Sequence, residues 1–188
     1  MEPVAKSEML IRRPVADVFA AFIDPAITSR FWFSKGSGRL EAGKQVQWDW
    51  EMYNFSVPLR VKVVEENKRI VVEWDAYEEP STIEWVFSGR ADDTTFVSIT
   101  NSGFGGTAEE KVKKALDSTE GFTFVLAGLK AWLEHGIELN LVRDRFPGGV
   151  STGTIVHHSR HCLRGPQSGL PRDARSLNQN LLQPGKLR

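Results

Sequence analysis

The sequence predicts an α+β fold in which a single long helix covers one face of an antiparallel sheet. From Glu120 to Glu134 apolar residues recur at steps of three and four, which places them on one broad face of a helix. These apolar positions are Phe122, Val125, Leu126, Leu129, Trp132 and Leu133. Several runs upstream alternate apolar and polar residues, as strands with one covered face do. We therefore expect this helix and sheet to pack against each other.

The chain is expected to begin with a short strand and two short helical segments. Residues 7–12 are predicted as the strand. Pro14 is predicted at the first position of a helix, where its missing N–H would be unpaired anyway, and Asp24-Pro25 end that helix. The apolar stripe of this helix is Val15, Val18, Phe19 and Phe22. A helical turn from Ile27 to Phe33 follows, and Gly36-Ser-Gly38 end it.

Further along, the apolar period changes from 3.6 to 2, which predicts an antiparallel meander with one solvated face. Short polar connections separate the runs, as hairpin loops do. The last run covers residues 94–101. The inward positions of the earlier runs are Val46, Trp48, Trp50 and Met52; Val57, Leu59, Val61 and Val63; Ile70, Val72 and Trp74; and Ile83, Trp85 and Phe87.

The helical part after the sheet begins with a capping signal. Thr107 and Glu110 have the spacing of a capping box, in which each side chain satisfies an unpaired backbone N–H. The helix either continues or restarts at Asp117 or Ser118. It is expected to run past Gly136 as far as Arg143.

The composition divides the chain into a folded body, residues 1–147, and a basic tail, residues 148–188. All aromatic residues (eleven Phe, six Trp and two Tyr) precede residue 150, and the tail holds six basic residues against one acid. A body of this length buries about 70% of its unfolded surface and forms one core. The tail cannot bury enough apolar surface to offset its ordering entropy. We expect it to be disordered or loosely held.

The sequence also limits the compartment and the partners. Cys162 is the only cysteine, which excludes an intrachain disulfide. The N-terminus lacks the layout of a signal peptide, and no apolar run approaches the ~20 residues that a membrane span needs. The acidic body without a basic stripe argues against nucleic-acid binding. We expect a cytoplasmic protein, either a monomer or a homodimer.

Several short motifs, in order, resemble the family of Activator of Hsp90 ATPase homologues within the START-like (SRPBCC) superfamily. They are Ile11-Arg-Arg-Pro14 with Val18-Phe19, Ile23-Asp-Pro25 with Trp32, Leu40-Glu-Ala-Gly43, Trp74, the Gly103 turn, Gly121-Phe122, Leu129-Lys130 and Trp132-Leu-Glu-His-Gly136. The resemblance covers roughly residues 5 to 140. One departure is Phe122, where family members commonly carry Trp; either aromatic would fill the position.

This resemblance implies a helix-grip fold, in which a curved antiparallel sheet of six to seven strands wraps round the last helix and leaves an apolar cavity. It also implies three alternative functions. The first is non-catalytic binding of an apolar or lipid-like small molecule. The second is a co-chaperone role in the stress response, with stimulation of an Hsp90-type ATPase. The third is an enzyme similar to a polyketide cyclase or hydrolase. Fold alone does not choose among them, and we favour the first.

The residues expected to line the ligand site are mostly large aromatics that project from the sheet toward the helix. Each of these rings is also a candidate for plain core packing, since aromatics dominate cores and ligand pockets alike. Phe104 is placed near the mouth, in a glycine-rich turn that forms a gate. The full set is Trp32, Trp48, Trp50, Trp74, Trp85, Phe104, Phe122, Leu126 and Leu129.

No catalytic residue, metal or cofactor is predicted. The strand acids Asp49, Glu51, Glu73, Asp75 and Glu84 alternate with the apolar residues, which places them on the solvated face. His135 is expected at the surface. Residues 157–162 hold three His and one Cys, but adjacent ligands in a tail make a poor zinc site. The candidates for a polar anchor inside the cavity are Ser98, Thr100 and Asn101.

Overall fold

The computed structural model describes residues 2–76 and 79–147. In this part of the chain seven strands form one antiparallel sheet in the order β1-β7-β6-β5-β4-β3-β2. The strands are β1 (Ala5–Ile11), β2 (Lys35–Gly36), β3 (Gln45–Trp50), β4 (Phe55–Glu65), β5 (Arg69–Trp74), β6 (Ser81–Gly89) and β7 (Thr95–Ser102). The helices are α1 (Val15–Ile23), α2 (Pro25–Thr28), α3 (Ala108–His135) and α4 (Leu141–Asp144), with a short 3₁₀ helix η1 at Glu51–Tyr53.

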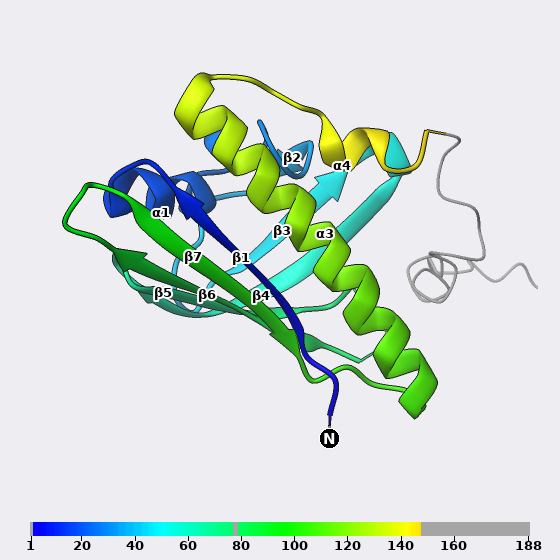
Figure 1. Cartoon of the computed structure of the whole chain (residues 1–188). Helices are drawn as coiled ribbons and strands as arrows, with labels where there is room; N and C mark the ends of the chain where they lie inside the picture. The colour runs from blue at the N-terminus through cyan, green and yellow to red at the C-terminus, as the bar shows by residue number, and fades with distance from the viewer. Residues whose placement is uncertain (1, 77–78, 148–188) are drawn as a thin grey trace, which may run out of the picture.

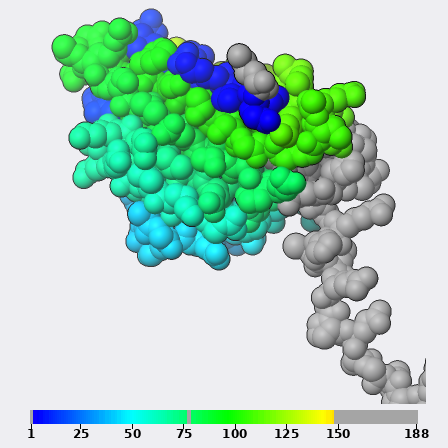
Figure 2. Space-filling view, turned by 90° about the horizontal axis from the view of Figure 1, so that it is seen from below, coloured from blue at the N-terminus to red at the C-terminus, as the bar shows by residue number. Residues whose placement is uncertain are grey.

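Figure 1 shows α3 lying obliquely across one face of the curved sheet, while α1 packs beside one end of it. We call the face under α3 the inner face. Alternation in β6 and β7 buries every second side chain on that face, as the period of two predicts. Figure 2 views the molecule from below, where residues coloured from cyan to green, which include those of β4 to β7, make up much of the surface. The predicted α+β class and the cover of the sheet by one long helix are therefore confirmed.

The long helix α3 is a single continuous element. Its capping box is present: the backbone N–H of Glu110 donates to Thr107 Oγ1 over 3.3 Å, and the N–H of Thr107 donates to Glu110 Oε2 over 2.7 Å. The helix runs through residues 117–118 without a restart. It ends at His135 because Gly136 takes a left-handed conformation with φ of 67°. The predicted continuation to Arg143 is wrong, and α4 is a separate short helix.

Two boundaries near the N-terminus differ from the prediction. Pro14 is the extended residue before α1, with ψ of 149°, so the helix begins one residue later. The helical turn predicted for residues 27–33 lies at Pro25–Thr28 instead. The reason is that Asp24 caps this turn by accepting a hydrogen bond from the Ala26 N–H over 3.0 Å, with Pro25 at the first helical position. The two-residue strand β2, too short to show a period, was not predicted and pairs with β3.

Two residues predicted on the inner face lie elsewhere. Met52 is in η1 and not in β3, because the chain turns there and Asn54 takes a left-handed conformation before β4 begins. Val63 was expected to continue the inward row of β4. The pairing of β4 with β5 shifts register between Val61 and Val63, and Val64 packs against the core in its place.

Candidate functional site

The predicted tryptophans converge on the inner face from separate elements. Trp48 and Trp50 come from β3, Trp74 from β5 and Trp85 from β6, and their rings face the helix because their positions share one parity along each strand. Trp48 and Trp85 are only 1% exposed. Trp74 is half-buried, which places part of its ring at the edge of the cluster. The predicted inward orientation of these rings is confirmed.

Trp32 holds the centre of this cluster from the segment between α2 and β2. Its ring centroid is 4.7 Å from that of Trp48 and 5.8 Å from that of Phe122. It is nearly parallel to Trp74, at 12° and 6.1 Å. Such separations are typical of aromatic pairs in contact. One side chain thus links the sheet to α3.

The helix contributes Phe122, Leu126 and Leu129, all buried in the same cluster as the tryptophans. The ring of Phe122 lies 6.4 Å from that of Trp85, at 83°. Phe104 is placed differently, since it is buried with Ala5 and Ala115 in a second, smaller cluster. The structure therefore brings eight of the nine predicted residues together and sets Phe104 apart beneath the first half of α3.

The cluster also holds aromatics that the site prediction did not include, among them Phe22, Phe31 and Phe33. Phe22 of α1 lies 6.0 Å from Trp85, and Phe33 stacks on Trp48 at 4.7 Å. Phe31 packs edge-on against Phe22 at 5.7 Å. Phe22 belongs to the predicted apolar stripe of α1, so its burial could be foreseen. Phe31 and Phe33 flank Trp32 in a segment whose apolar residues follow no clear period, so the sequence did not indicate that these two rings would be buried.

The inner face is polar at one end. Asn101 is 2% exposed, and its side-chain N–H donates to Ser118 Oγ over 3.1 Å. The hydroxyl of Ser7 donates to the carbonyl of Thr119 over 2.9 Å. Of the three anchor candidates only Asn101 is buried here; Ser98 and Thr100 alternate with it and fall on the other face.

Asp49, Glu73, Asp75 and Glu84 lie away from the inner face, as predicted, whereas Glu51 lies in η1 and not in a strand. Arg60 donates to Glu73 over 2.7 Å and holds Asp75 with two hydrogen bonds of 2.7 and 2.8 Å. Hydrogen bonds from Arg60 and from Lys62 lower the pKa of Glu73. These carboxylates are already paired with cations, so they are not available as acids or bases facing the interior.

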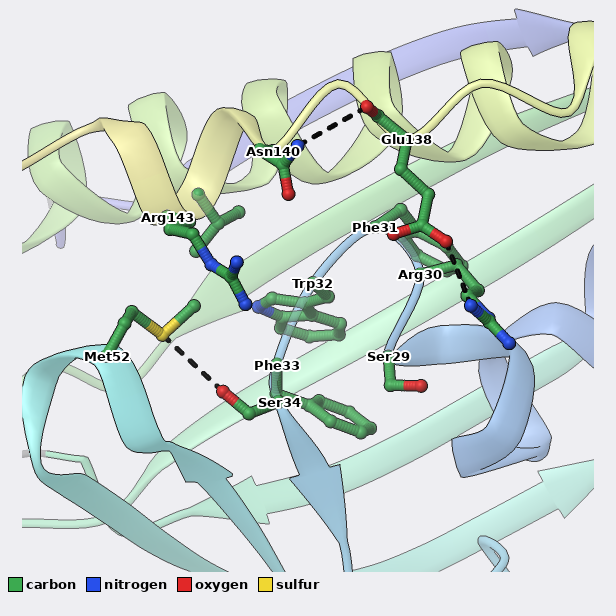
Figure 3. Close-up of a pocket in the computed structure, with 11 residues that line it drawn as sticks. Ser29, Arg30, Phe31, Trp32, Phe33, Ser34, Met52, Glu138, Asn140 and Arg143 are labelled. Atoms are coloured by element: carbon green, nitrogen blue, oxygen red, sulfur yellow. Dashed lines mark hydrogen bonds and ion pairs between the residues drawn. The ribbon is translucent and has the colours of Figure 1, made fainter.

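A small cleft opens at the surface above this cluster (Figure 3). It has a volume of about 90 Å³ and lies between residues 29–34, Met52 and residues 138–143. Its rim carries an ion pair of 2.9 Å between Arg30 and Glu138. Trp32 is its only member from the predicted ligand-lining set. Ligand pockets occupy roughly 300–1,000 Å³, so this cleft is too small to hold a drug-sized molecule.

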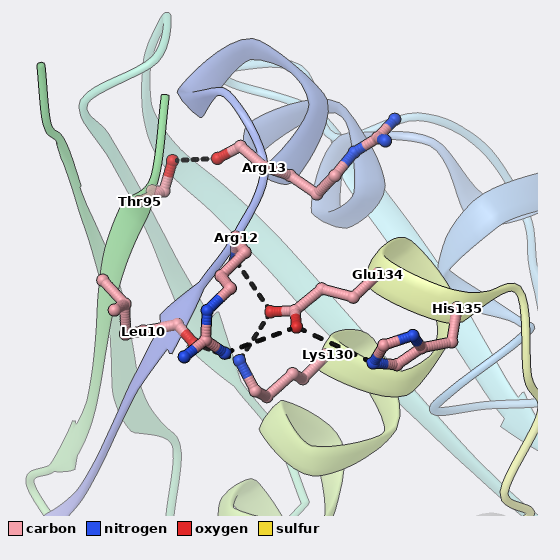
Figure 4. Close-up of polar contacts among 7 residues, drawn as sticks. All are labelled: Leu10, Arg12, Arg13, Thr95, Lys130, Glu134 and His135. Carbon is pink, nitrogen blue, oxygen red and sulfur yellow. Dashed lines mark hydrogen bonds and ion pairs between the residues drawn. The ribbon is translucent and has the colours of Figure 1, made fainter. Parts of the chain in front are cut away.

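The end of α3 is fixed to β1 by polar contacts around Glu134 (Figure 4). The Glu134 carboxylate accepts hydrogen bonds from the Arg12 backbone N–H over 2.7 Å and from Lys130 Nζ over 2.5 Å. Lys130 also donates to the Leu10 carbonyl over 2.8 Å. The neighbouring His135 is exposed, as predicted. These contacts join the end of α3 to the end of β1.

The described ranges hold neither a cluster of metal-ligand side chains nor a helix suited to span a membrane. No three His, Cys, Asp or Glu side chains within residues 2–76 and 79–147 come together as metal ligands would. The His and Cys candidates of residues 157–162 lie outside the described residues. None of the helices in the described part combines the length and hydropathy that a bilayer crossing requires.

The chain has the helix-grip fold of the START-like superfamily. Three features define this class: the order of the elements, the sheet curled round a long C-terminal helix, and the apolar contact between sheet and helix. The family described as Activator of Hsp90 ATPase homolog 1-like protein matches residues 12–134. This chain belongs to that family, and the resemblance seen in the sequence is confirmed.

Solved structures share the fold. Protein SSP2350 from Staphylococcus saprophyticus is 32% identical, with 72% of this chain and 95% of that chain covered and a TM-score of 0.63. The Aha1 dimer from Colwellia psychrerythraea is 17% identical, with 71% and 97% covered and a TM-score of 0.60. DynU16, from the dynemicin biosynthetic locus, is 18% identical, with 73% and 49% covered and a TM-score of 0.65. At these identities the last two show the fold alone. A search of curated proteins found no match.

Proposed function

We propose that this protein binds an apolar small molecule between the inner face of the sheet and α3, without catalysing a reaction. The observation that carries the proposal is a contrast along α3. Its second half fills the space above the sheet with Phe122, Val125, Leu126 and Leu129, whereas the buried residues of its first half are only Ala115 and Ser118. Toward that end the helix side chains that face the sheet are small, and Phe104 is the large side chain buried beside them.

The chemistry of the buried residues favours binding over catalysis. In the described ranges the buried polar residues carry hydroxyl or amide groups: Ser7, Thr28, Ser81, Thr95, Asn101 and Ser118. General acid–base chemistry on a polyketide-like substrate uses a positioned acid, base or histidine. None of those six is such a group, so a cyclase or hydrolase is not the function that we propose.

Native mass spectrometry of the freshly purified full-length chain tests the binding proposal, together with a thermal-shift screen of apolar small molecules. We expect a retained mass, or a melting temperature that rises with ligand concentration as mass action requires. A protein that carries no ligand and responds to no compound would contradict the proposal.

A second candidate is a co-chaperone interaction with an Hsp90-type ATPase, in keeping with a role in the stress response. The family match favours it, as does the outer face of the sheet, where Arg60 and Arg69 pair with Glu73, Asp75 and Glu84. Paired charges on an exposed face provide electrostatic complementarity for a protein partner. Stimulation of a purified Hsp90-type ATPase by the full chain in the absence of ligand would support this candidate over the first.

The setting that we propose is the cytoplasm, with the body of residues 1–147 as the binding unit and residues 148–188 as a separate tail. Both a monomer and a homodimer are compatible with a site inside one chain. Analytical ultracentrifugation of the full-length protein would distinguish these two states.

A further inference from the structure

Three polar side chains share one patch of the inner face where β6 and β7 pair. Asn101 is directly opposite Ile83. Ser81 and Trp85 are two residues to either side of Ile83 on the same strand, so they are the diagonal neighbours of Asn101 on one face of the sheet. Each of them lies roughly 7–8 Å from Asn101 across the two strands, so Asn101 stands between the other two along this face.

One atom of each side chain is buried without a hydrogen-bond partner. These atoms are Ser81 Oγ, Trp85 Nε1 and Asn101 Oδ1, and none finds a partner in the part of the chain that the structure describes. The three residues are 0%, 1% and 2% exposed. The amide nitrogen of Asn101 is already used on Ser118, which leaves its oxygen as the unpaired atom. Buried polar atoms in native proteins nearly always have a hydrogen-bond partner, so three unpaired atoms in one patch indicate that another molecule supplies the partner.

The patch joins the aromatic cluster, where Trp85 lies 6.4 Å from Phe122, to the end of the inner face where Asn101 meets small side chains of α3. Ser118 of α3 contacts Asn101, and Ala115 lies one helical turn away. Ser81 is paired with Trp74, whose half-buried ring marks the edge of the aromatic cluster. A molecule that lies along the tryptophans would therefore reach these atoms with one of its ends.

We propose that Ser81, Trp85 and Asn101 bind the polar end of the ligand and select a neutral molecule that carries a hydroxyl group. The inference rests on the proposed binding function. A hydroxyl both donates and accepts, which matches the acceptor of Asn101, the donor of Trp85 and the dual capacity of Ser81. A carboxylate or ammonium would be buried here without a counter-charge, because Ser81, Trp85, Asn101 and the neighbouring Ser118 are all uncharged.

The test compares 2-naphthol with 2-methylnaphthalene, which replaces the hydroxyl by a methyl group of similar size. Calorimetric titration of the full-length wild-type protein should give 2-naphthol an affinity about three- to tenfold higher, the effect of one net hydrogen bond. In a nitrogen-15 spectrum, 2-naphthol should shift the indole N–H resonance of Trp85 further than 2-methylnaphthalene does. The variant Trp85→Phe assigns that resonance. The charged analogue 2-naphthoate should bind more weakly than both.

The variant Ser81→Ala removes one hydroxyl that has no partner in the described part, so the fold is retained. It should reduce the preference for 2-naphthol, and Ser98→Ala on the outer face of β7 should leave the preference unchanged. Equal affinities for both probes with an unmoved Trp85 resonance would overturn this inference alone. That result would indicate that a bound water is the hydrogen-bond partner of the three atoms, since water donates and accepts hydrogen bonds as a hydroxyl does. Binding of neither probe would contradict the proposed function as well.

Discussion

At the scale of single residues, the tryptophans of the inner face differ in what surrounds them. Trp48 is 1% exposed and is packed between Trp32 and Phe33, with ring centroids 4.7 Å away in each case. A ring enclosed in this way contributes to the stability of the fold whether or not a ligand is bound. Trp74 is half-buried and contacts the same cluster from its edge. Trp48 is therefore expected to be structural, and the ring of Trp74 to be accessible to a ligand from the edge of the cluster.

The substitution Trp48→Ala should lower the free energy of unfolding by about 3–5 kcal/mol, the range for removal of a large buried aromatic. Urea unfolding followed by circular dichroism measures the loss. The control is Val112→Ala on the exposed face of α3, where the side chain is 48% exposed and the expected change is within about 0.5 kcal/mol. A loss for Trp48→Ala no larger than that of the control would contradict the packing described above.

Glu134 provides a pH-dependent link between α3 and β1. Burial by itself raises the pKa of this carboxyl, but the hydrogen bonds from Lys130 and from the Arg12 backbone, with the charges of both residues, outweigh burial and lower it. A carboxyl whose folded pKa is depressed stabilises the protein above its unfolded pKa, and that contribution is lost as the pH falls through the folded pKa. The contribution is therefore present at neutral pH and disappears in acid.

The substitution Glu134→Gln should lower the free energy of unfolding at pH 7 by about 1–3 kcal/mol, since a charged hydrogen-bond partner is removed from a side chain that is 7% exposed. The difference from wild type should shrink as the pH falls below the ordinary value of 4.5. Urea unfolding between pH 3 and pH 7 measures both effects. A double-mutant cycle with Lys130→Met isolates the pair. The same deficit at pH 3 and pH 7 would show that the carboxylate charge has no part in it.

At the scale of elements, the two glycines within α3 face different surroundings. A Cβ on Gly128 would lie 3.1 Å from Phe31 Cβ and 3.2 Å from the Phe31 carbonyl oxygen. A Cβ on Gly121 would meet only Arg145 Nη1, at 3.6 Å, which is an ordinary contact. Gly128 is thus the position where the helix approaches the segment that carries Trp32, and Gly121 is a position with free space.

The pair Gly121→Ala and Gly128→Ala should therefore change stability in opposite directions. Alanine in a helix interior is more favourable than glycine by roughly 0.5–1 kcal/mol, and Gly121→Ala should realise this gain. Gly128→Ala gains the same propensity but loses more by crowding Phe31, so a net loss of about 1 kcal/mol is expected. Thermal unfolding of both variants measures the difference. Stabilisation by Gly128→Ala would contradict the close approach of α3 to Phe31.

The elements that were predicted correctly from the sequence are those with a strong local pattern of apolar residues. The alternation in β3, β5 and β6 and the stripe of α3 are regular, so their inward residues were placed correctly apart from Met52, which lies in η1 beyond the end of β3. The bulge after Val61 breaks the alternation through a register shift that no residue type announces. Pairing with β3 creates β2, whose two residues show no period. The orphaned atoms of Ser81 and Trp85 depend on tertiary surroundings, which single-sequence patterns do not contain.

At the scale of the whole molecule, one sheet presents two faces with different chemistry. The inner face is aromatic with a neutral polar end, and α3 covers it. The outer face carries paired charges centred on Arg60, Glu73 and Asp75. Because successive side chains of a strand point to opposite faces, the ligand and a protein partner would contact different residues of the same strands. Substitutions can therefore separate the two candidate functions.

A ligand present at 100 times its dissociation constant adds about 2.7 kcal/mol to stability, which raises the melting temperature of a chain of this size by roughly 5–10 °C. We expect Trp74→Ala to lower the affinity for the most stabilising compound of the screen about tenfold. This loss removes roughly 3–5 °C of the rise in melting temperature at the same ligand concentration. The reason is that Trp74 is half-buried at the edge of the cluster, in register with Ser81, where the ligand would enter.

The matched control is Trp132→Ala, which truncates another half-buried tryptophan, one that lies near Arg30 at the surface of α3. Both variants should melt below wild type when no ligand is present, but only Trp74→Ala should lose part of the rise that the ligand produces. An equal rise in the two variants would place the ligand away from Trp74. In that case the binding surface would have to be sought outside the inner face, beginning with the paired charges around Arg60.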